Sequence, residues 1–420
     1  MTLAAAAAAA VVVIAAAPAA AQDSCGVPAA SSWTQTETTV WQQLCAGEWA
    51  DLNPTGEILD PSQPDGWDER RVLSSAFVEQ LLTEPYATLI DRHGIHLIGA
   101  WFPGGLDIHE AAMSFPLRCQ HCRIAELQAD ETLIDGTLDL RTSTIEGDLV
   151  LVGTDIGGNL EVGNGSVVSG TLNADRLTVA GNVFLDDGSR FTDIILLGAD
   201  IGGDLSVVGG SVVSGTLNAD GLTVAGSVFL GERSQFKAIR LLDADIGGQL
   251  AVQGGSVVSG TLAADGLTVA GSVFLDGGSR FKEIILRGAD IGGTLEVDGG
   301  SVVSGPLTAD RLTVAGDVFL RDGSRFKEII LLGADIGGQL DVSNRSVVSG
   351  TLTADGLTVA GSVFLADGSQ FTDIRLHSAD IGGQLDVSNR SVVSGTLTAD
   401  GLTVAGSVFL ADGSQFTDIR

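Results

Sequence analysis

Beyond about residue 104, the chain is a succession of short stretches in which apolar and polar positions alternate. Alternation with a period of two is typical of β-strands that bury one face, and each stretch is too short for a helix. Glycine and β-branched residues crowd the same stretches, which disfavours helix and suits strands. The apolar pairs recur about every 11 residues, for example at Leu205/Val207, Leu217/Ala219, Val228/Leu230 and Ile239/Leu241.

The alternating stretches belong to a longer repeat of 45 residues. The phrase Asp-Ile-Gly-Gly marks this repeat and begins at Asp155, Asp200, Asp245, Asp290, Asp335 and Asp380. Short strands at a fixed period, separated by Gly, Asn and Asp, indicate a solenoid or a ring of blades. The four stretches of one repeat are alike, and no Asn-Gly or Asp-Gly hairpin turn recurs between them, which disfavours a β-propeller.

We therefore predict a mainly β fold, a parallel, right-handed β-helix with about 22 residues per coil and two coils per repeat. The same phase continues back to Leu106, so coiling is expected to start near Gly104 and the solenoid to span residues 103–420. About fourteen coils with strands about 4.8 Å apart give a rod roughly 65–70 Å long. Proline would remove a ladder hydrogen bond, and after Pro116 only Pro306 occurs.

Residues 22–102 differ in composition and predict a small, mostly helical head. All tryptophans, the one tyrosine and all cysteines of the chain lie before residue 123. Helical spacing predicts one helix over 38–46, a second that Ser74 or Ser75 caps, and a third that begins at Pro85. An apolar strand over 95–102 follows, and we expect the head to cover the open end of the solenoid.

Residues 1–21 predict a secretory signal peptide. The segment is uncharged, apolar and short for a membrane span, and Ala19-Ala20-Ala21 fits the small-residue cleavage rule. The alternative is a retained membrane anchor, whereas cleavage leaves no stable span. The expected location is the periplasm, the cell surface or the medium. A net charge of −31 disfavours nucleic acid as a partner, because phosphate binding needs a surplus of Lys and Arg.

Export implies an oxidising compartment, where an even number of cysteines can pair completely. We predict disulfides between Cys25 and Cys45 and between Cys119 and Cys122. The sequence Cys119-Gln-His121-Cys122 is also the most metal-like cluster, but the chain has no second Cys-x-x-Cys and no haem-attachment pattern.

Other metal sites are disfavoured by spacing. His93, His96 and His109 could join His121 at the junction of head and solenoid, but their spacing matches no ligand template. Two rows of aspartates could offer oxygens to Ca²⁺, but members of one row are expected two coils apart, about 9.6 Å, which is too far to share an ion. We predict corner-forming aspartates that bond to nearby backbone, and no metal or cofactor. The first row is the Asp of each Asp-Ile-Gly-Gly; the second is Asp175, Asp220, Asp265, Asp310, Asp355 and Asp400.

Two phenylalanine rows recur with the repeat. Each member of the first row lies between two inward residues, so alternation points it outward, where it could stack on sugar rings or contact a second rod unless loops cover it. The second row is expected to point inward near a corner. The outward row is Phe184, Phe229, Phe274, Phe319, Phe364 and Phe409; the inward row is Phe191, Phe236, Phe281, Phe326, Phe371 and Phe416.

The head motif Trp33…Trp41…Cys45-Ala-Gly47…Ala50-Asp51-Leu52-Asn53 precedes repeated Ile-Gly-Gly-x-Leu and Val-Ala-Gly-x-Val-Phe-Leu units. With these motifs the chain resembles a group of uncharacterised secreted bacterial β-helix repeat proteins that carry a small helical, Trp-containing head. The tail is loosely similar to pentapeptide-repeat and bactofilin-type solenoids, but it lacks a strict five-residue period and carries a leader and a head. The resemblance implies the fold and no settled activity.

We expect no enzymatic activity, because β-helix lyases and hydrolases use irregular loops with clustered carboxylates and bases, whereas these loops are monotonous. The expected function is that of an exported structural or adhesive rod. One alternative is a carbohydrate-binding surface protein that uses the outward Phe row on a cell-surface glycan. Another is an acidic mimic of DNA, which the leader disfavours. The chain stops within a repeat, at Arg420, which suggests a fragment or end-to-end self-association.

Overall fold

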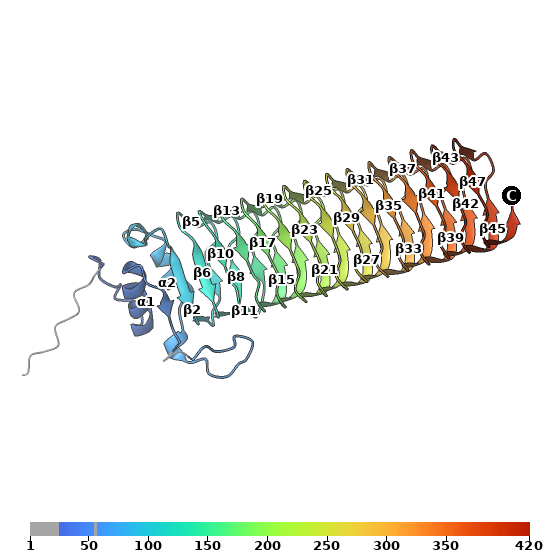
Figure 1. Cartoon of the computed structure of the whole chain (residues 1–420). Coiled ribbons are helices and arrows are strands. Elements are labelled where there is room, and N and C mark those ends of the chain that lie inside the picture. Colours follow the sequence, from blue (N-terminus) through green and yellow to red (C-terminus); the bar gives the residue numbers. More distant parts are fainter. Residues whose placement is uncertain (1–24, 54–56) are drawn as a thin grey trace, which may run out of the picture.

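A computed structural model shows a small head at one end of a long rod of stacked coils (Figure 1). The structure describes residues 25–53 and 57–420, so the predicted leader lies outside the described residues. Every strand pairing in the described part of the chain is parallel, and the predicted β-solenoid is confirmed.

The coils contribute strands to three sheets, which we call A, B and C. Most coils give one strand to each sheet, but each of the first three coils gives two short strands to sheet B. A representative coil consists of β14 (Leu160–Glu161) in sheet A, β15 (Val167–Asn173) in sheet B and β16 (Thr178–Val179) in sheet C. The next coil begins with β17 (Val183–Phe184), where Val183 pairs with Leu160. The 11-residue period indicated only two strands per coil, and the strands of sheet C, such as β16, were missed.

Sheet A runs the whole length of the rod and contains sixteen strands, all but β2 and β6 of them two residues long. Its strands are β1 (Ala50–Asp51), β2 (Ile95–Ile98), β6 (Leu117–Gln120), β10 (Leu138–Asp139), β14 (Leu160–Glu161), β17 (Val183–Phe184), β20 (Leu205–Ser206), β23 (Val228–Phe229), β26 (Leu250–Ala251), β29 (Val273–Phe274), β32 (Leu295–Glu296), β35 (Val318–Phe319), β38 (Leu340–Asp341), β41 (Val363–Phe364), β44 (Leu385–Asp386) and β47 (Val408–Phe409).

The solenoid begins earlier than the sequence suggested. Strand β2 pairs with β6, with Ile95 opposite Leu117, so the apolar stretch 95–102 forms part of the first coil. Because β1 comes from the head, the remaining fifteen strands of sheet A represent fifteen coils, one more than the fourteen expected.

The inside of the rod is filled by ladders of like residues. Leu205, Val228 and Leu250 occupy successive steps of one ladder and are completely buried. The inward Phe row is confirmed, since Phe191 and its equivalents as far as Phe371 are only 2 % exposed. Such a core needs each coil to present the same apolar shape to its neighbours, which explains the repetition of the sequence.

The head confirms two of the three predicted helices. Helix α1 (Gln35–Cys45) begins at a capping box between Thr34 and Glu37, and α2 (Ser75–Leu81) is capped by Ser74. The other helical segments in the described part of the head are the 3₁₀ helices Glu69–Arg71 and Ala87–Leu89. The second of these replaces the predicted third helix.

The head also covers the first coil. Strand β1 pairs with β2, with Ala50 opposite Leu97, so the head supplies the terminal strand of sheet A. The edge of sheet A in the first coil is therefore hydrogen-bonded to the head and is not left free. An exposed strand edge would otherwise favour association with other chains.

Close contact between coils leaves no room for a side chain at several glycines of each repeat, of which Gly247 is one example. A Cβ atom on Gly247 would lie 2.4 Å from the backbone oxygen of Ala225 in the preceding coil. We expect Gly247→Ala to lower the free energy of unfolding by about 1–3 kcal/mol, because two backbones must move apart. Gly104→Ala is the control, since no atom lies within 4 Å of its Cβ position. Equal urea midpoints for the two variants would contradict the prediction.

Candidate functional site

The outer side of sheet A carries the outward Phe row and the ion pairs and carboxylates that surround it. We call this surface, from His96 in β2 to Phe409 in β47, the Phe face. Alternation along each strand directs the residue after the buried position toward solvent. Phe184, for example, lies between the fully buried Val183 and Leu185.

All six residues of the predicted outward Phe row lie on this face. Five are half-buried, and Phe409, in the last coil, is 44 % exposed. Phe229 pairs across the sheet with Ser206 on one side and with Ala251 on the other, so members of the row are two coils apart. The rings therefore lie about 9.6 Å apart along the rod, with one smaller or acidic residue between them.

The Phe row is constant from repeat to repeat, whereas its neighbours are not. An outward position in a strand does not require an aromatic residue for the core, and yet all six repeats have one. The residues that separate the rings differ in size and charge, and so do those two positions after each ring. The separating residues are Ser206, Ala251, Glu296, Asp341 and Asp386, and Glu161 precedes the first ring; those after the rings are Asp186, Gly231, Asp276, Arg321, Ala366 and Ala411.

Phe319 is covered by a side chain of its own coil. The Arg321 guanidinium carbon lies 3.8 Å from the centre of the Phe319 ring, a cation–π contact. The same guanidinium lies 3.4 Å from Asp341 and 3.7 Å from Asp322. Acidic side chains on both sides therefore hold Arg321 over the ring.

Three carboxylates gather beside this arginine. Oxygen atoms of Asp276, Glu296 and Asp298 all lie within 4.8 Å of one another. Partial burial raises the pKa of each carboxyl group, and the negative charges of neighbouring carboxylates raise the pKa of Glu296 and Asp298 further. Protonation is thus easier here than on a free side chain, and this part of the Phe face repels anions at neutral pH.

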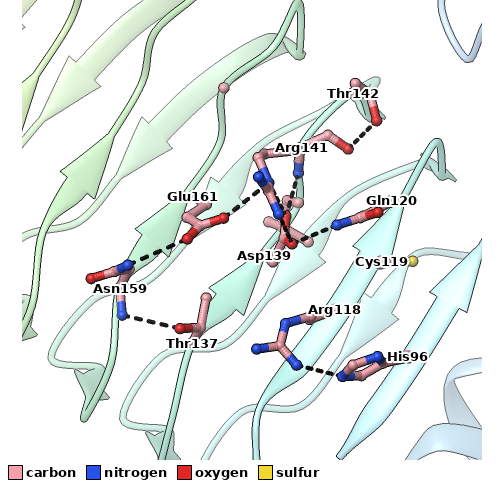
Figure 2. Close-up of polar contacts among 12 residues, drawn as sticks. His96, Arg118, Cys119, Gln120, Thr137, Asp139, Arg141, Thr142, Asn159 and Glu161 are labelled. Carbon is pink, nitrogen blue, oxygen red and sulfur yellow. Dashed lines mark hydrogen bonds and ion pairs between the residues drawn. The ribbon is translucent and has the colours of Figure 1, made fainter. Parts of the chain in front are cut away.

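A polar network occupies the end of the Phe face next to the head (Figure 2). The completely buried carboxylate of Asp139 accepts hydrogen bonds from Arg141 at 2.8 and 3.0 Å and from Gln120 at 2.7 Å. Arg141 also pairs with Glu161 of the next coil at 2.9 Å. The network links the strands β6, β10 and β14 across the outside of the sheet.

The charge of Asp139 is stabilised by these contacts. Burial by itself raises the pKa of this carboxyl group, but the hydrogen bonds from Arg141 and Gln120 outweigh burial and lower the pKa. Asp139 is therefore ionised throughout the neutral range and serves as a structural anion rather than as a proton donor.

His96 lies beside this network and contacts the head. Its Nε2 atom meets the Arg118 guanidinium, and its ring packs edge-on against Trp49, with centroids 4.6 Å apart. Burial lowers the pKa of His96, and the charge of Arg118 lowers it further, so the imidazole is neutral. The arrangement fastens the head to the first coil.

The predicted junction histidines have different partners. His109 pairs with Asp107 at 2.6 Å, and this hydrogen bond raises the pKa of the imidazole, whereas His96 contacts Arg118. The cysteines are paired as predicted: the Cα atoms lie 5.5 Å apart for Cys25–Cys45 and 5.7 Å apart for Cys119–Cys122.

The two aspartate rows lie in different parts of the coil. The first row lies in the strands of sheet C, as Asp200 does in β19 (Asp200–Ile201), so the prediction of corner-forming residues is wrong for this row, whereas the second row lies in turns. Asp200 and Asp245 each pair with Thr223, which places them two coils apart as expected. In the second row, Asp220 accepts a hydrogen bond from the backbone N–H of Leu242 at 3.0 Å, and Asp355 accepts one from that of His377 at 3.1 Å. Both bonds join a corner to the next coil, the structural role predicted for this row.

Sequence reasoning missed the Asp139–Arg141 network and the cover over Phe319. The available signal was the variation among repeats at outward positions, which distinguishes Arg321 from Gly231 at equivalent places.

No protein-family model, no curated protein and no solved structure matches this chain. Of the resemblance to secreted bacterial β-helix repeat proteins, only the β-solenoid fold is confirmed, and membership of that group stays a prediction. Among the described helices, none is both long and apolar enough to cross a bilayer.

The pKa of Asp139 predicts how its contribution to stability depends on pH. The folded-state pKa lies below the unfolded value near 3.9, so the stabilisation is complete above about pH 4 and is lost as the pH falls through the folded-state pKa. We expect Asp139→Asn to lower the free energy of unfolding at pH 7 by about 2 kcal/mol. This value is smaller than the usual cost of breaking a buried ion pair, because the Arg141 side chain is 39 % exposed and solvent screens the interaction.

The measurement is urea unfolding of both proteins between pH 7 and pH 3, where the difference should shrink toward the acid end. Asp68→Asn is the control, since Asp68 pairs with Arg70 on the exposed surface and its loss should change stability little. A difference that is independent of pH would contradict the assignment of Asp139 as a structural anion.

Proposed function

We propose that the protein is an exported, non-enzymatic adhesive rod that binds surface carbohydrate through the Phe face. The observation that supports this proposal is the constancy of the outward Phe row amid neighbours that vary. An aromatic ring offers a flat apolar surface on which a sugar ring can stack, while the varied polar neighbours suit its hydroxyl groups. Rings at a constant spacing can contact successive units of one extended polymer.

The non-enzymatic part of the proposal rests on the repeated surface. The six repeats contain a single histidine, His377, and no cysteine. On the Phe face, Asp139, Glu161 and Asp341 are each paired with an arginine. Carboxylates held in this way are poor proton donors. The pKa values of Asp276, Glu296 and Asp298 on the same face are raised, so the non-enzymatic part of the proposal rests on the monotonous loops rather than on the lack of a proton donor.

Export is supported by the leader in residues 1–21 and by two cysteine pairs at disulfide distance. An acidic mimic of DNA would act in the cytosol, where disulfides are rare, so we favour the adhesive rod over that alternative.

We expect a cell that produces the full chain to release it from the cytosol, with a mass that corresponds to a start at Gln22 and two disulfides. Fractionation followed by intact-mass measurement, with and without a reductant, tests this expectation. An uncleaved, reduced chain in the cytosol would contradict export.

We expect the double variant Phe274→Ala/Phe364→Ala to lose roughly tenfold or more in affinity for the glycans that the unmodified protein binds on an array, because two stacking rings are removed. The matched control is Thr223→Ala/Thr268→Ala, which changes two outward positions of sheet C on another side of the rod.

Circular dichroism is measured for both double variants, and an unchanged spectrum would show that they keep the solenoid. The absence of glycan binding by the unmodified protein, or an equal loss in the control, would contradict the carbohydrate proposal.

A further inference from the structure

Phe229 differs from the other members of the outward row in its surroundings. Its cross-strand neighbours, Ser206 and Ala251, are small and uncharged. Every other ring of the row has at least one acidic neighbour across the sheet: Glu161 beside Phe184, Glu296 beside Phe274 and Phe319, Asp341 beside Phe319 and Phe364, and Asp386 beside Phe364 and Phe409.

The residue two positions after Phe229 is a glycine, Gly231, and has no side chain. Gly231 stands where Arg321 stands beside Phe319, so no side chain at that position covers the ring. A hollow of about 230 Å³ results. It is lined by Ser206, Val208, Phe229, Gly231, Glu232, Ala251 and Gln253.

We propose that this hollow is a subsite for one neutral sugar ring, with Phe229 as its stacking surface. The inference rests on the proposed function and adds the position and the class of the sugar. Pockets for drug-sized ligands occupy about 300–1,000 Å³, so this smaller hollow suits a single ring.

Charge selects a neutral sugar. No lysine or arginine lines the hollow, and Glu232 lies at its edge. The Phe face beyond it carries the Asp276–Glu296–Asp298 group, and the whole chain has a net charge of −31. An anionic sugar would find no cation in the lining of this hollow, although Arg233 lines the adjacent hollow beyond Glu232. Gln253, Ser206 and Glu232 can form hydrogen bonds with neutral hydroxyl groups.

The direction of the polymer follows from the row. The next ring of the row, Phe274, lies two coils away, about 9.6 Å along the rod axis. A chain seated at Phe229 therefore extends along the rod, across the strands.

The test compares the same substitution at equivalent positions of two repeats. Phe229→Ala removes the uncovered ring, and Phe319→Ala removes the ring that Arg321 covers. Binding of the full chain to a soluble neutral β-glucan and to a polyuronate is measured by calorimetry. We expect Phe229→Ala to weaken binding of the β-glucan roughly 3- to 10-fold and Phe319→Ala to leave it within about twofold.

A third variant copies the covered arrangement without removing a ring. Gly231→Arg places an arginine where Arg321 stands in the fourth repeat, with Glu232 in place of Asp322 to pair with it over Phe229. A Cβ atom on Gly231 would lie 3.2 Å from the backbone oxygen of Gln253, so thermal unfolding is measured alongside binding. We expect a loss of affinity like that of Phe229→Ala in a variant that remains folded.

The outcomes separate the two proposals. If Phe319→Ala weakens binding as much as Phe229→Ala, or if the polyuronate binds more tightly than the β-glucan, the subsite is wrong and the adhesive rod stands. If the unmodified protein binds neither polymer but binds other glycans, the subsite as proposed is wrong and the adhesive rod stands. If it binds no glycan at all, the proposed function is wrong as well.

Discussion

The structure depends on the parallel ladder by which each coil pairs with the one before it. Backbone hydrogen bonds fix the spacing between coils, and like residues then stack inside, such as Leu205 on Val228 on Leu250. Because a coil contacts only its immediate neighbours, the stability of the rod is a sum of similar local interfaces. The head fits the same scheme, since β1 pairs with β2 as another strand of sheet A.

This ladder divides the residues of a coil into two classes. Inward positions are constrained by the coils above and below, as the fully buried ladder of Leu205, Val228 and Leu250 illustrates. Outward positions are free to differ, and on the Phe face they do, from Asp186 to Gly231 to Arg321. A residue that stays constant at a free position needs another explanation, and for the outward Phe row we have argued that the explanation is a ligand.

Periodicity was sufficient to predict the solenoid, the length of a coil, the inward Phe row and the cysteine pairs, because each follows from a pattern that repeats or from counting. It did not reveal sheet C, whose strands are two residues long, or the inclusion of Ile95 in the first coil, where the repeat has not yet become regular. The contacts of the Phe face were also beyond reach. The burial of Asp139 and the position of Arg321 over Phe319 depend on side chains from several coils, and their register is known only once the coils are stacked.

The register between repeats has a consequence for the evolution of the protein. Asp200, Thr223 and Asp245 show that each 45-residue unit meets the next through the same pairing, and residues 334–375 are identical to residues 379–420. Gain or loss of a unit therefore creates no new interface and changes the reach of the molecule by about 9.6 Å. Duplication within the gene can thus lengthen the rod in equal steps, while the residues at its N-terminal end stay the same.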